Sequence, residues 1–216
     1  GNFHRAHQAL YLNNYLNETK DLNWGICAIN LRKEEQENFN FLKKRDGKYI
    51  LKTISTSGDT EYHEINSIQK LIDWSKNKED AENVLTDPNI EIVTMTVTES
   101  GYYITENNEL NSNLKIVKDN IENKEHSIIF SYLLNSLKKR MNSINKKITL
   151  LCCDNIRENG LMLEKALNKY VECSGEFELL EWIKNNVSFP SCVVDRITPR
   201  PPEKLKEEIF NKFKIK

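Results

Sequence analysis

Three polar side chains that can bind a ligand follow apolar runs of this 216-residue sequence. Glu99 comes after the β-branched run 90–98, Asn155 after the apolar run 148–153, and Asp195 after the run 189–194. Ligands of open α/β sheets gather at the carboxyl ends of strands, where these residues are predicted to lie. The amide of Asn155 can donate a hydrogen bond to a substrate oxygen. The pattern therefore indicates a site built from loops at one edge of a sheet.

Each of these residues also has a purely structural interpretation. The Asp154-Asn155 dipeptide suits an Asx-turn or a helix cap. Asp195 can pair with Arg196 to close a turn, and Glu99 can cap the turn that follows it. We favour the functional interpretation because all three residues follow predicted strands.

The sequence opens with Gly1, which is followed at once by an amphipathic run that reaches Leu16. The apolar residues of this run recur near helical spacing, so a glycine turn is predicted to lead directly into a helix. The N–H groups of such a turn and the positive end of the helix suit a phosphate group. Arg5 is either an additional charge for that phosphate or a residue of the helix surface. His4 and His7 are predicted to lie near one face of this helix. They could form a metal site, act as a catalytic base or have a structural role.

The run 24–30 is short and apolar, which is typical of a buried parallel strand and fits the second strand of a βαβ unit. In dinucleotide-binding folds an acidic residue just past this strand binds the ribose hydroxyl groups, and Glu34 and Glu35 are the candidates. Arg32 and Lys33 favour instead the 2′-phosphate of NADP. All four charges also fit the solvated start of a helix.

Helices and strands are predicted to alternate along the rest of the chain. Helices are expected at 33–45, 67–77, 79–86, 127–141, 161–171 and 176–185, with a last, charged helix after Pro202. Strands are expected at 48–56 and 60–65, which form a β-hairpin, and at 90–98, 148–153 and 189–199, while 105–125 shows no clear pattern. This alternation predicts a mostly parallel sheet with helices on both faces, which is an α/β, Rossmann-like fold with a β-hairpin insertion.

Composition argues against several classes of protein. The formal net charge of −1 gives no electrostatic case for nucleic acid or for an anionic membrane. No apolar run approaches the roughly 20 residues needed to span a bilayer. The five cysteines, Cys27, Cys152, Cys153, Cys173 and Cys192, are odd in number and lack both disulfide-framework and zinc spacing. We therefore expect structural thiols, no metal, and a reducing, cytoplasmic location.

Four stretches resemble, in order, the motifs of one family. The opening GNFHRAH is similar to G-x-G-x-F-H-R-A-H, and residues 96–102 are similar to T-V-T-E-x-G-Y. Residues 153–160 resemble C-D-N-x-x-x-N-G, and residues 194–199 read V-D-R-I-T-P, the most specific match. The chain thus resembles the long-chain mannitol dehydrogenase family, which includes mannitol 2-dehydrogenase, fructuronate reductase and related polyol dehydrogenases.

The resemblance implies that residues 1–199 form an NAD(P)-binding domain whose first glycine and first strand are missing. Residues 200–216 would begin the connection to a missing, helical C-terminal domain. NAD is the implied cofactor, with NADP possible, and its pyrophosphate would meet the N–H groups of Gly1, Asn2 and Phe3. Arg5 and Glu34 are the further cofactor candidates.

The resemblance also assigns roles to the three strand-end residues. Asn155 would be half of a pair that stabilises the substrate oxyanion, and a preorganised donor of this kind is worth roughly 3 kcal/mol. Asp195 would hold the hydroxyl groups of the substrate, and Glu99 would contact the nicotinamide side of the cofactor. Because the family resembles metal-independent dehydrogenases, we favour structural or pocket-lining roles for His4 and His7.

The catalytic base of the family is a lysine in a K-x-x-x-x-N-x-x-H motif of the C-terminal domain. Lys118, Asn123 and His126 fit this spacing, but they precede the C-D-N and V-D-R-I-T-P stretches, whereas the family motif follows both. We therefore reject them and expect the lysine beyond Lys216.

The resemblance implies the cofactor-binding part of an enzyme that interconverts a secondary alcohol and a ketone, such as mannitol and fructose or mannonate and fructuronate. Without its general base, this part alone is expected to be inactive. The alternatives are a non-catalytic nucleotide-binding module, a decayed gene fragment, and a sugar-phosphate dehydrogenase of a neighbouring family.

Overall fold

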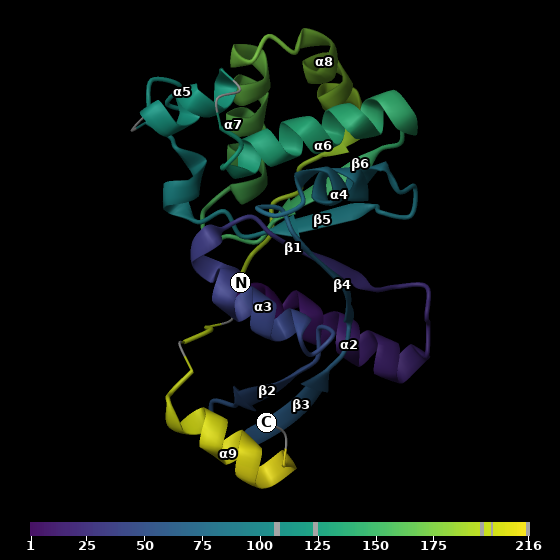
Figure 1. The fold of residues 1–216 in the computed structure, drawn as a ribbon, viewed down its shortest axis with the longest axis vertical. Helices are drawn as coiled ribbons and strands as arrows, with labels where there is room; N and C mark the ends of the chain where they lie inside the picture. The colour runs from purple at the N-terminus through teal and green to yellow at the C-terminus, as the bar shows by residue number, and fades with distance from the viewer. Residues whose placement is uncertain (106–108, 123–124, 195–196, 200, 215–216) are drawn as a thin grey trace. The chain divides into compact units, whose positions relative to one another are not determined.

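The computed structural model describes the chain except for residues 106–108, 123–124, 195–196, 200 and 215–216 (Figure 1). The chain divides into two compact units, which are considered separately. One comprises residues 1–28, 37–71 and 196–216, and the other comprises residues 29–36 and 72–195.

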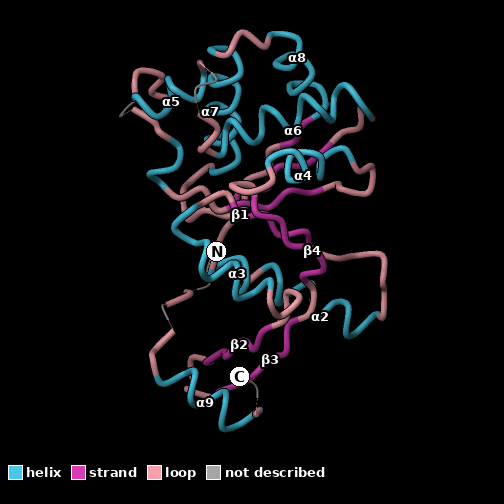
Figure 2. The backbone as a smooth tube through the Cα atoms, viewed as in Figure 1, coloured by secondary structure: helices cyan, strands magenta, loops and turns pink. Residues whose placement is uncertain are grey.

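The first unit is made of helices and a hairpin (Figure 2). It contains α1 (Asn2–Ala6), α2 (Gln8–Thr19), most of α3 (Gln36–Lys43), β2 (Tyr49–Ile54), β3 (Thr60–Ile65) and α9 (Lys204–Phe213). Its core joins Ala9 and Leu10 of α2 to Leu42, Ile65 and Ile68. The apolar side of the opening run is therefore buried, as its helical spacing predicts.

The predicted opening helix is present but divided. α1 and α2 meet at His7, whose φ of −121° and ψ of −88° are not helical. The N–H of Arg5 bonds to the carbonyl of Gly1 at 3.3 Å, so the helical bonding does begin at the glycine. The helix predicted directly after Gly1 is confirmed, while its continuity through His7 is wrong.

The predicted hairpin is confirmed. β2 and β3 pair antiparallel, with Tyr49 opposite Ile65 and Ile54 opposite Thr60. The charged helix α9 lies against this hairpin, where Glu208 accepts a 2.7 Å hydrogen bond from Lys52. This contact explains how so polar a helix is held in the unit.

Two strands contribute residues to both units. β1 (Ile26–Asn30) confirms the strand predicted near 24–30, and it is hydrogen-bonded to β4 (Ile68–Asp73). The helix predicted over 67–77 is therefore wrong. Backbone pairing with β1 decides the conformation, as shown by the 3.0 Å bond from the N–H of Trp74 to the carbonyl of Asn30.

A parallel three-stranded sheet organises the second unit. β5 (Ile92–Met95), β6 (Ile148–Cys152) and β7 (Val187–Ser188) lie in that order, with β6 in the middle. The helices of this unit are α4 (Lys78–Asn83), α5 (Lys115–Ile121), α6 (Ile129–Ser143), α7 (Asn159–Cys173) and α8 (Phe177–Asn186), with the 3₁₀ turns η1 (Lys33–Glu35), η2 (Val84–Thr86) and η3 (Glu99–Tyr102). Its core includes the fully buried Phe130, Leu150 and Leu163.

This arrangement confirms the α/β prediction, with three differences. Beside the predicted hairpin, the described strands form two separate sheets in place of one. The pattern-poor segment 105–125 contains the short helix α5. The strand predicted at 189–199 is wrong over its described residues, because β7 ends at Ser188 and Cys192 pairs with the side chain of Asn159 instead of with a strand.

Gly160 sits where α7 approaches the segment after β7, and it supports a stability prediction. A methyl group at Gly160 would lie 2.3 Å from the carbonyl oxygen of Phe189 and 2.7 Å from the carbonyl carbon of Pro190. These are backbone atoms that cannot rotate away, so we expect Gly160→Ala to lower the free energy of unfolding by about 3 kcal/mol in urea titrations. Gly101→Ala is the control, because its added methyl group meets only the side chain of Val97. Equal midpoints for the two variants would contradict the prediction.

Candidate active site

The loops that leave the carboxyl ends of β5 and β6 meet at Asp154. This carboxylate is 4% exposed, and its two oxygens accept the N–H groups of Val97 and Thr98, each at 3.0 Å. The hydroxyl of Tyr102 donates to the same carboxylate at 2.8 Å, and Sγ of Cys152 lies 3.0 Å from it. A buried charge is tolerated when hydrogen-bond donors surround it, and Asp154 meets this condition.

The loop after β5 holds an unusual backbone conformation at this point. Thr98 has φ of 64° and ψ of 158°, a region that is essentially restricted to glycine. Such strain persists only where surrounding contacts impose it. The bond from the Thr98 N–H to Asp154 is one such contact, so the carboxylate holds the turn into η3.

Asn159, at the start of α7, makes the matching connection to the segment after β7. Its side chain is fully buried; Nδ2 donates to the carbonyls of Asp154 and Cys192, both at 2.8 Å, and Oδ1 accepts the N–H of Cys192 at 3.0 Å. The N–H of Gly160 bonds to Oγ of Ser191 at 3.2 Å. The buried side chains of Asp154 and Asn159 therefore join the loops after β5, β6 and β7 by hydrogen bonds.

Of the three residues that the sequence predicts at this edge of the sheet, the structure describes the positions of Asn155 and Glu99 but not that of Asp195. Asn155 is exposed and follows Asp154 directly, at the carboxyl end of the central strand. Glu99 lies in η3, within the loop that Asp154 holds. Asp195 falls outside the described residues, three positions after Cys192. Asp154 and Asn159 belong to the C-D-N and N-G motifs, but sequence reasoning gave them no role.

The cluster around Asp154 predicts loss of stability in alkali. Burial, reinforced by the hydrogen bond to Asp154, raises the pKa of Cys152 from 9.0 to about 12, and burial also raises the pKa of Tyr102. A folded-state pKa above the unfolded value means that the stabilisation is complete below pH 9.0 and is lost as the pH rises toward about 12. We expect the free energy of unfolding, measured in urea, to fall across this window. The fall should be shallower in Cys152→Ala, and an unchanged slope would contradict the assignment.

The residues predicted to meet the pyrophosphate lie in the first unit. Gly1 and Asn2 are exposed, whereas Phe3 and Arg5 are half-buried. The guanidinium of Arg5 bonds to the side-chain oxygen of Asn2, and the carbonyl of Arg5 accepts a 2.6 Å bond from the hydroxyl of Tyr49. This pairing leaves the charge of Arg5 beside the first turn of α1.

His4 is held in its neutral form. Burial, helped by the positive charge of Arg5, lowers the pKa of His4 from 6.5 to about 4. The ring of His7 stacks on Phe3 with centroids 4.9 Å apart. The structural or pocket-lining roles that we favour for both histidines stay a prediction.

Charged side chains past β1 lie in the second unit and fit the ribose end of a dinucleotide. Glu34 and Arg32 are exposed, with Nε of Arg32 3.7 Å from the carboxylate of Glu34. A carboxylate there accepts hydrogen bonds from ribose hydroxyl groups, and the guanidinium suits a 2′-phosphate. Lys33 is also exposed, whereas Glu35 is half-buried. The donor set therefore fits either NAD or NADP.

Neither a candidate metal cluster nor a candidate membrane-spanning helix is found among the described residues. None of their His, Cys, Asp and Glu side chains form a group of three or more that could hold a metal, and none of their helices is long and apolar enough to cross a membrane. Lys118 and His126 lie on and just after α5, and Asn123 is outside the described residues. All five cysteines are free thiols, and Cys173 is exposed.

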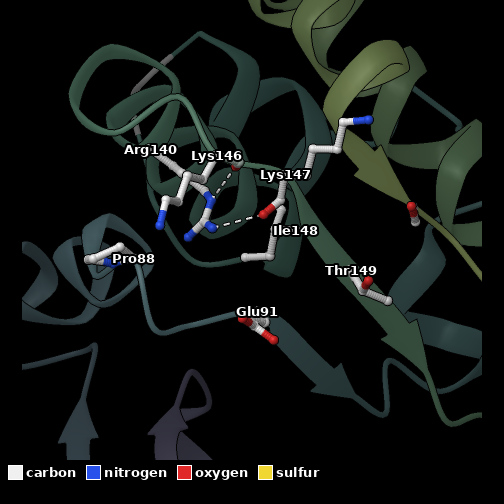
Figure 3. A pocket seen from close by; sticks show the side chains of 8 residues that line it. Pro88, Glu91, Arg140, Lys146, Lys147, Ile148 and Thr149 are labelled. Carbon is white, nitrogen blue, oxygen red and sulfur yellow. Dashed lines mark hydrogen bonds between the residues drawn. The ribbon is translucent and has the colours of Figure 1, made fainter.

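A surface pocket of about 350 Å³ lies at the opposite end of the parallel sheet (Figure 3). Residues that precede or begin β5 and β6 line it, including Glu91, Lys147 and Thr149. Ligands of open α/β sheets bind at the carboxyl ends of strands, so the position of this pocket does not fit the cofactor.

Parallel strands that end in joined polar loops define an α/β domain of the nucleotide-binding class. Comparison with known proteins agrees. The mannitol dehydrogenase Rossmann domain matches residues 1–215. D-arabinitol 4-dehydrogenase of Klebsiella pneumoniae is 35% identical over 209 residues, which are 97% of this chain and 46% of that protein. The polyol:NADP oxidoreductase of Gluconobacter oxydans is 34% identical over 206 residues, which are 92% of this chain and 41% of that protein.

A solved structure gives the same result. Mannitol 2-dehydrogenase of Pseudomonas fluorescens, in a ternary complex with NAD and D-mannitol, has a TM-score of 0.90 and 31% identity, covering 98% of this chain and 43% of that one. The chain therefore belongs to the mannitol dehydrogenase family, which confirms the resemblance in its motifs. It spans less than half the length of these relatives.

Proposed function

We propose that this chain is the cofactor-binding part of an NAD(P)-dependent dehydrogenase that interconverts a polyol or sugar acid and the corresponding ketone. The observation that carries the proposal is the family match over residues 1–215, together with the exposed Asn155 at the carboxyl end of β6. The relatives that cover the chain are named for arabinitol, mannitol and other polyols.

The site residues take the following roles in this proposal. NAD, when bound, supplies the hydride acceptor. The N–H groups of Gly1, Asn2 and Phe3 bind its pyrophosphate with help from Arg5, and the carboxylate of Glu34 binds its ribose.

The remaining candidates act on the substrate side. The amide of Asn155 donates a hydrogen bond to the substrate oxygen and stabilises negative charge there as it develops. Asp195 accepts hydrogen bonds from the substrate hydroxyl groups, and Glu99 contacts the nicotinamide side of the cofactor.

The proposed partner of this chain is a further, helical part of the same protein. Val193 and Ile197, on either side of Asp195, are 95% and 88% exposed, which is unusual for apolar side chains. We infer that this further part covers them and supplies the general base, a lysine. The five free thiols fit the reducing, cytoplasmic location that we propose.

The test is an assay of the complete protein that contains this chain. Arabinitol, mannitol, sorbitol and mannonate would be offered with NAD or NADP while the reduced cofactor is monitored by absorbance. Turnover of at least one substrate supports the proposal and identifies the cofactor. Calorimetry that detects NAD binding without turnover of any of them would favour the non-catalytic nucleotide-binding module.

A further inference from the structure

The peptide that joins Asp154 to Asn155 is held from two sides. The side chain of Asp154 reaches the loop after β5, and the carbonyl of Asp154 accepts a 2.8 Å bond from Asn159, which also holds Cys192 after β7. Because β6 is the central strand of the sheet, these contacts tie Asn155 to the loops of both neighbouring strands.

The contact with the β5 side is specific in its geometry. One oxygen of Asp154 accepts the N–H of Val97 and the other accepts the N–H of Thr98, so both carboxylate oxygens are used. The bond to Thr98 maintains a strained backbone conformation. An amide in place of this carboxylate would present an N–H group to one of these two N–H groups, and that half of the connection would be lost.

The contact of Asn159 with the segment after β7 resembles the hydrogen bonding between two paired residues of a β-sheet. Asn159 pairs with both the N–H and the carbonyl of Cys192, at 3.0 and 2.8 Å. The side chain thus does for Cys192 what an additional strand would do. Its side chain is 0% exposed, so its removal leaves the N–H and the carbonyl of Cys192 without these partners.

We propose that Asp154 and Asn159 are positioning residues that fix the peptide of Asn155, and thereby aim its amide at the reacting oxygen of the substrate. This inference rests on the proposed function of Asn155. Neither residue is assigned contact with the substrate. Their effect is on orientation, and a misplacement of about 1 Å can lower a rate by about 100-fold.

The experiment uses the complete protein and two matched pairs of variants. Asp154→Asn is paired with Tyr102→Phe, which removes one donor from the same buried cluster but leaves both backbone bonds. Asn159→Ala is paired with Ser191→Ala, which removes only the acceptor of the Gly160 N–H. For Asp154→Asn and Asn159→Ala we expect kcat to fall about 10- to 100-fold, while the Kd of NAD changes less than about twofold. The paired controls should retain kcat within about threefold.

Hydrogen exchange provides a readout that does not depend on activity. Exchange should accelerate at Val97 and Thr98 in Asp154→Asn, and at Cys192 in Asn159→Ala. Faster exchange with unchanged kcat would overturn the positioning role, and so would an equal loss of kcat in Tyr102→Phe or Ser191→Ala. If the wild-type protein turns over no polyol or sugar acid, the proposed function fails, whereas unchanged exchange in both variants would refute the positioning contacts themselves.

Discussion

Replacement of Asn155 by alanine is expected to lower kcat for polyol oxidation by about 100- to 1000-fold. A preorganised donor at a developing oxyanion is worth about 3–4 kcal/mol in the transition state, and much less in the ground state. Asn155 is exposed at the carboxyl end of β6, so its truncation creates no buried cavity. The KM for the polyol and the Kd of NAD should change far less than kcat. Steady-state kinetics of the complete protein, with calorimetry of NAD binding, measures all three quantities.

A matched variant separates this effect from a loss of folding. Asn185→Ala removes the same side chain from an exposed position of α8 and should retain wild-type kinetics. Asn155→Asp is a second check, because a carboxylate next to a developing negative charge should be at least as harmful as alanine. Activity of Asn155→Ala within about threefold of the wild type would show that this residue is only an Asx-turn or a helix cap.

Sequence patterns were sufficient to predict those helices and strands that are determined by residues adjacent in the sequence. The hairpin between 48 and 65 has two β-branched runs around Ser57-Gly58-Asp59, and it forms with the expected pairing. The buried strand at 148–153 is a continuous apolar run followed by polar residues, and it becomes the central strand β6. In both cases the residues that define the element are adjacent in sequence, so no distant contact was needed to predict it.

The wrong assignments depend on contacts that are distant in sequence. The segment 67–77 has apolar residues at spacings that suit a helix, but β1 provides a strand to pair with it. The segment after β7 has strand-like residues, but Asn159 takes the N–H and the carbonyl of Cys192 that a neighbouring strand would need. A periodic pattern does not contain the identity of the pairing partner.

In the candidate site, too, some residues could be predicted from the sequence and others could not. Asn155 could be singled out because a polar residue after a buried strand is visible in the sequence. The roles of Asp154 and Asn159 could not, because each depends on backbone groups 33 to 57 positions away. Their burial and their bonds to neighbouring loops emerge only from the folded chain.

Arg140 shows how a charged residue in a sequence pattern can belong to the core. It lies on α6 with only 1% of its surface exposed, and its guanidinium donates to the carbonyl of Leu85 at 2.7 Å. It also donates to the carbonyls of Lys146 and Lys147 at 2.7 and 2.9 Å (Figure 3). Burial lowers its pKa from the ordinary value. The side chain thus connects the residues just before β6 to η2, because it donates hydrogen bonds to carbonyls of both segments.

Arg140→Ala is therefore expected to lower the free energy of unfolding by about 4 kcal/mol, because it leaves the buried carbonyl of Leu85 and the partly buried carbonyls of Lys146 and Lys147 without this donor and opens a cavity. The midpoint of thermal unfolding should fall by roughly 10 °C. Arg140→Met fills much of the volume but donates no hydrogen bond, so the stability that it recovers over alanine measures packing alone. Arg157→Ala is the control, since Arg157 is exposed, and it should change stability by less than about 0.5 kcal/mol. If Arg140→Ala unfolds at the wild-type midpoint, the three carbonyls do not depend on Arg140, and water must be able to reach them at the start of the sheet.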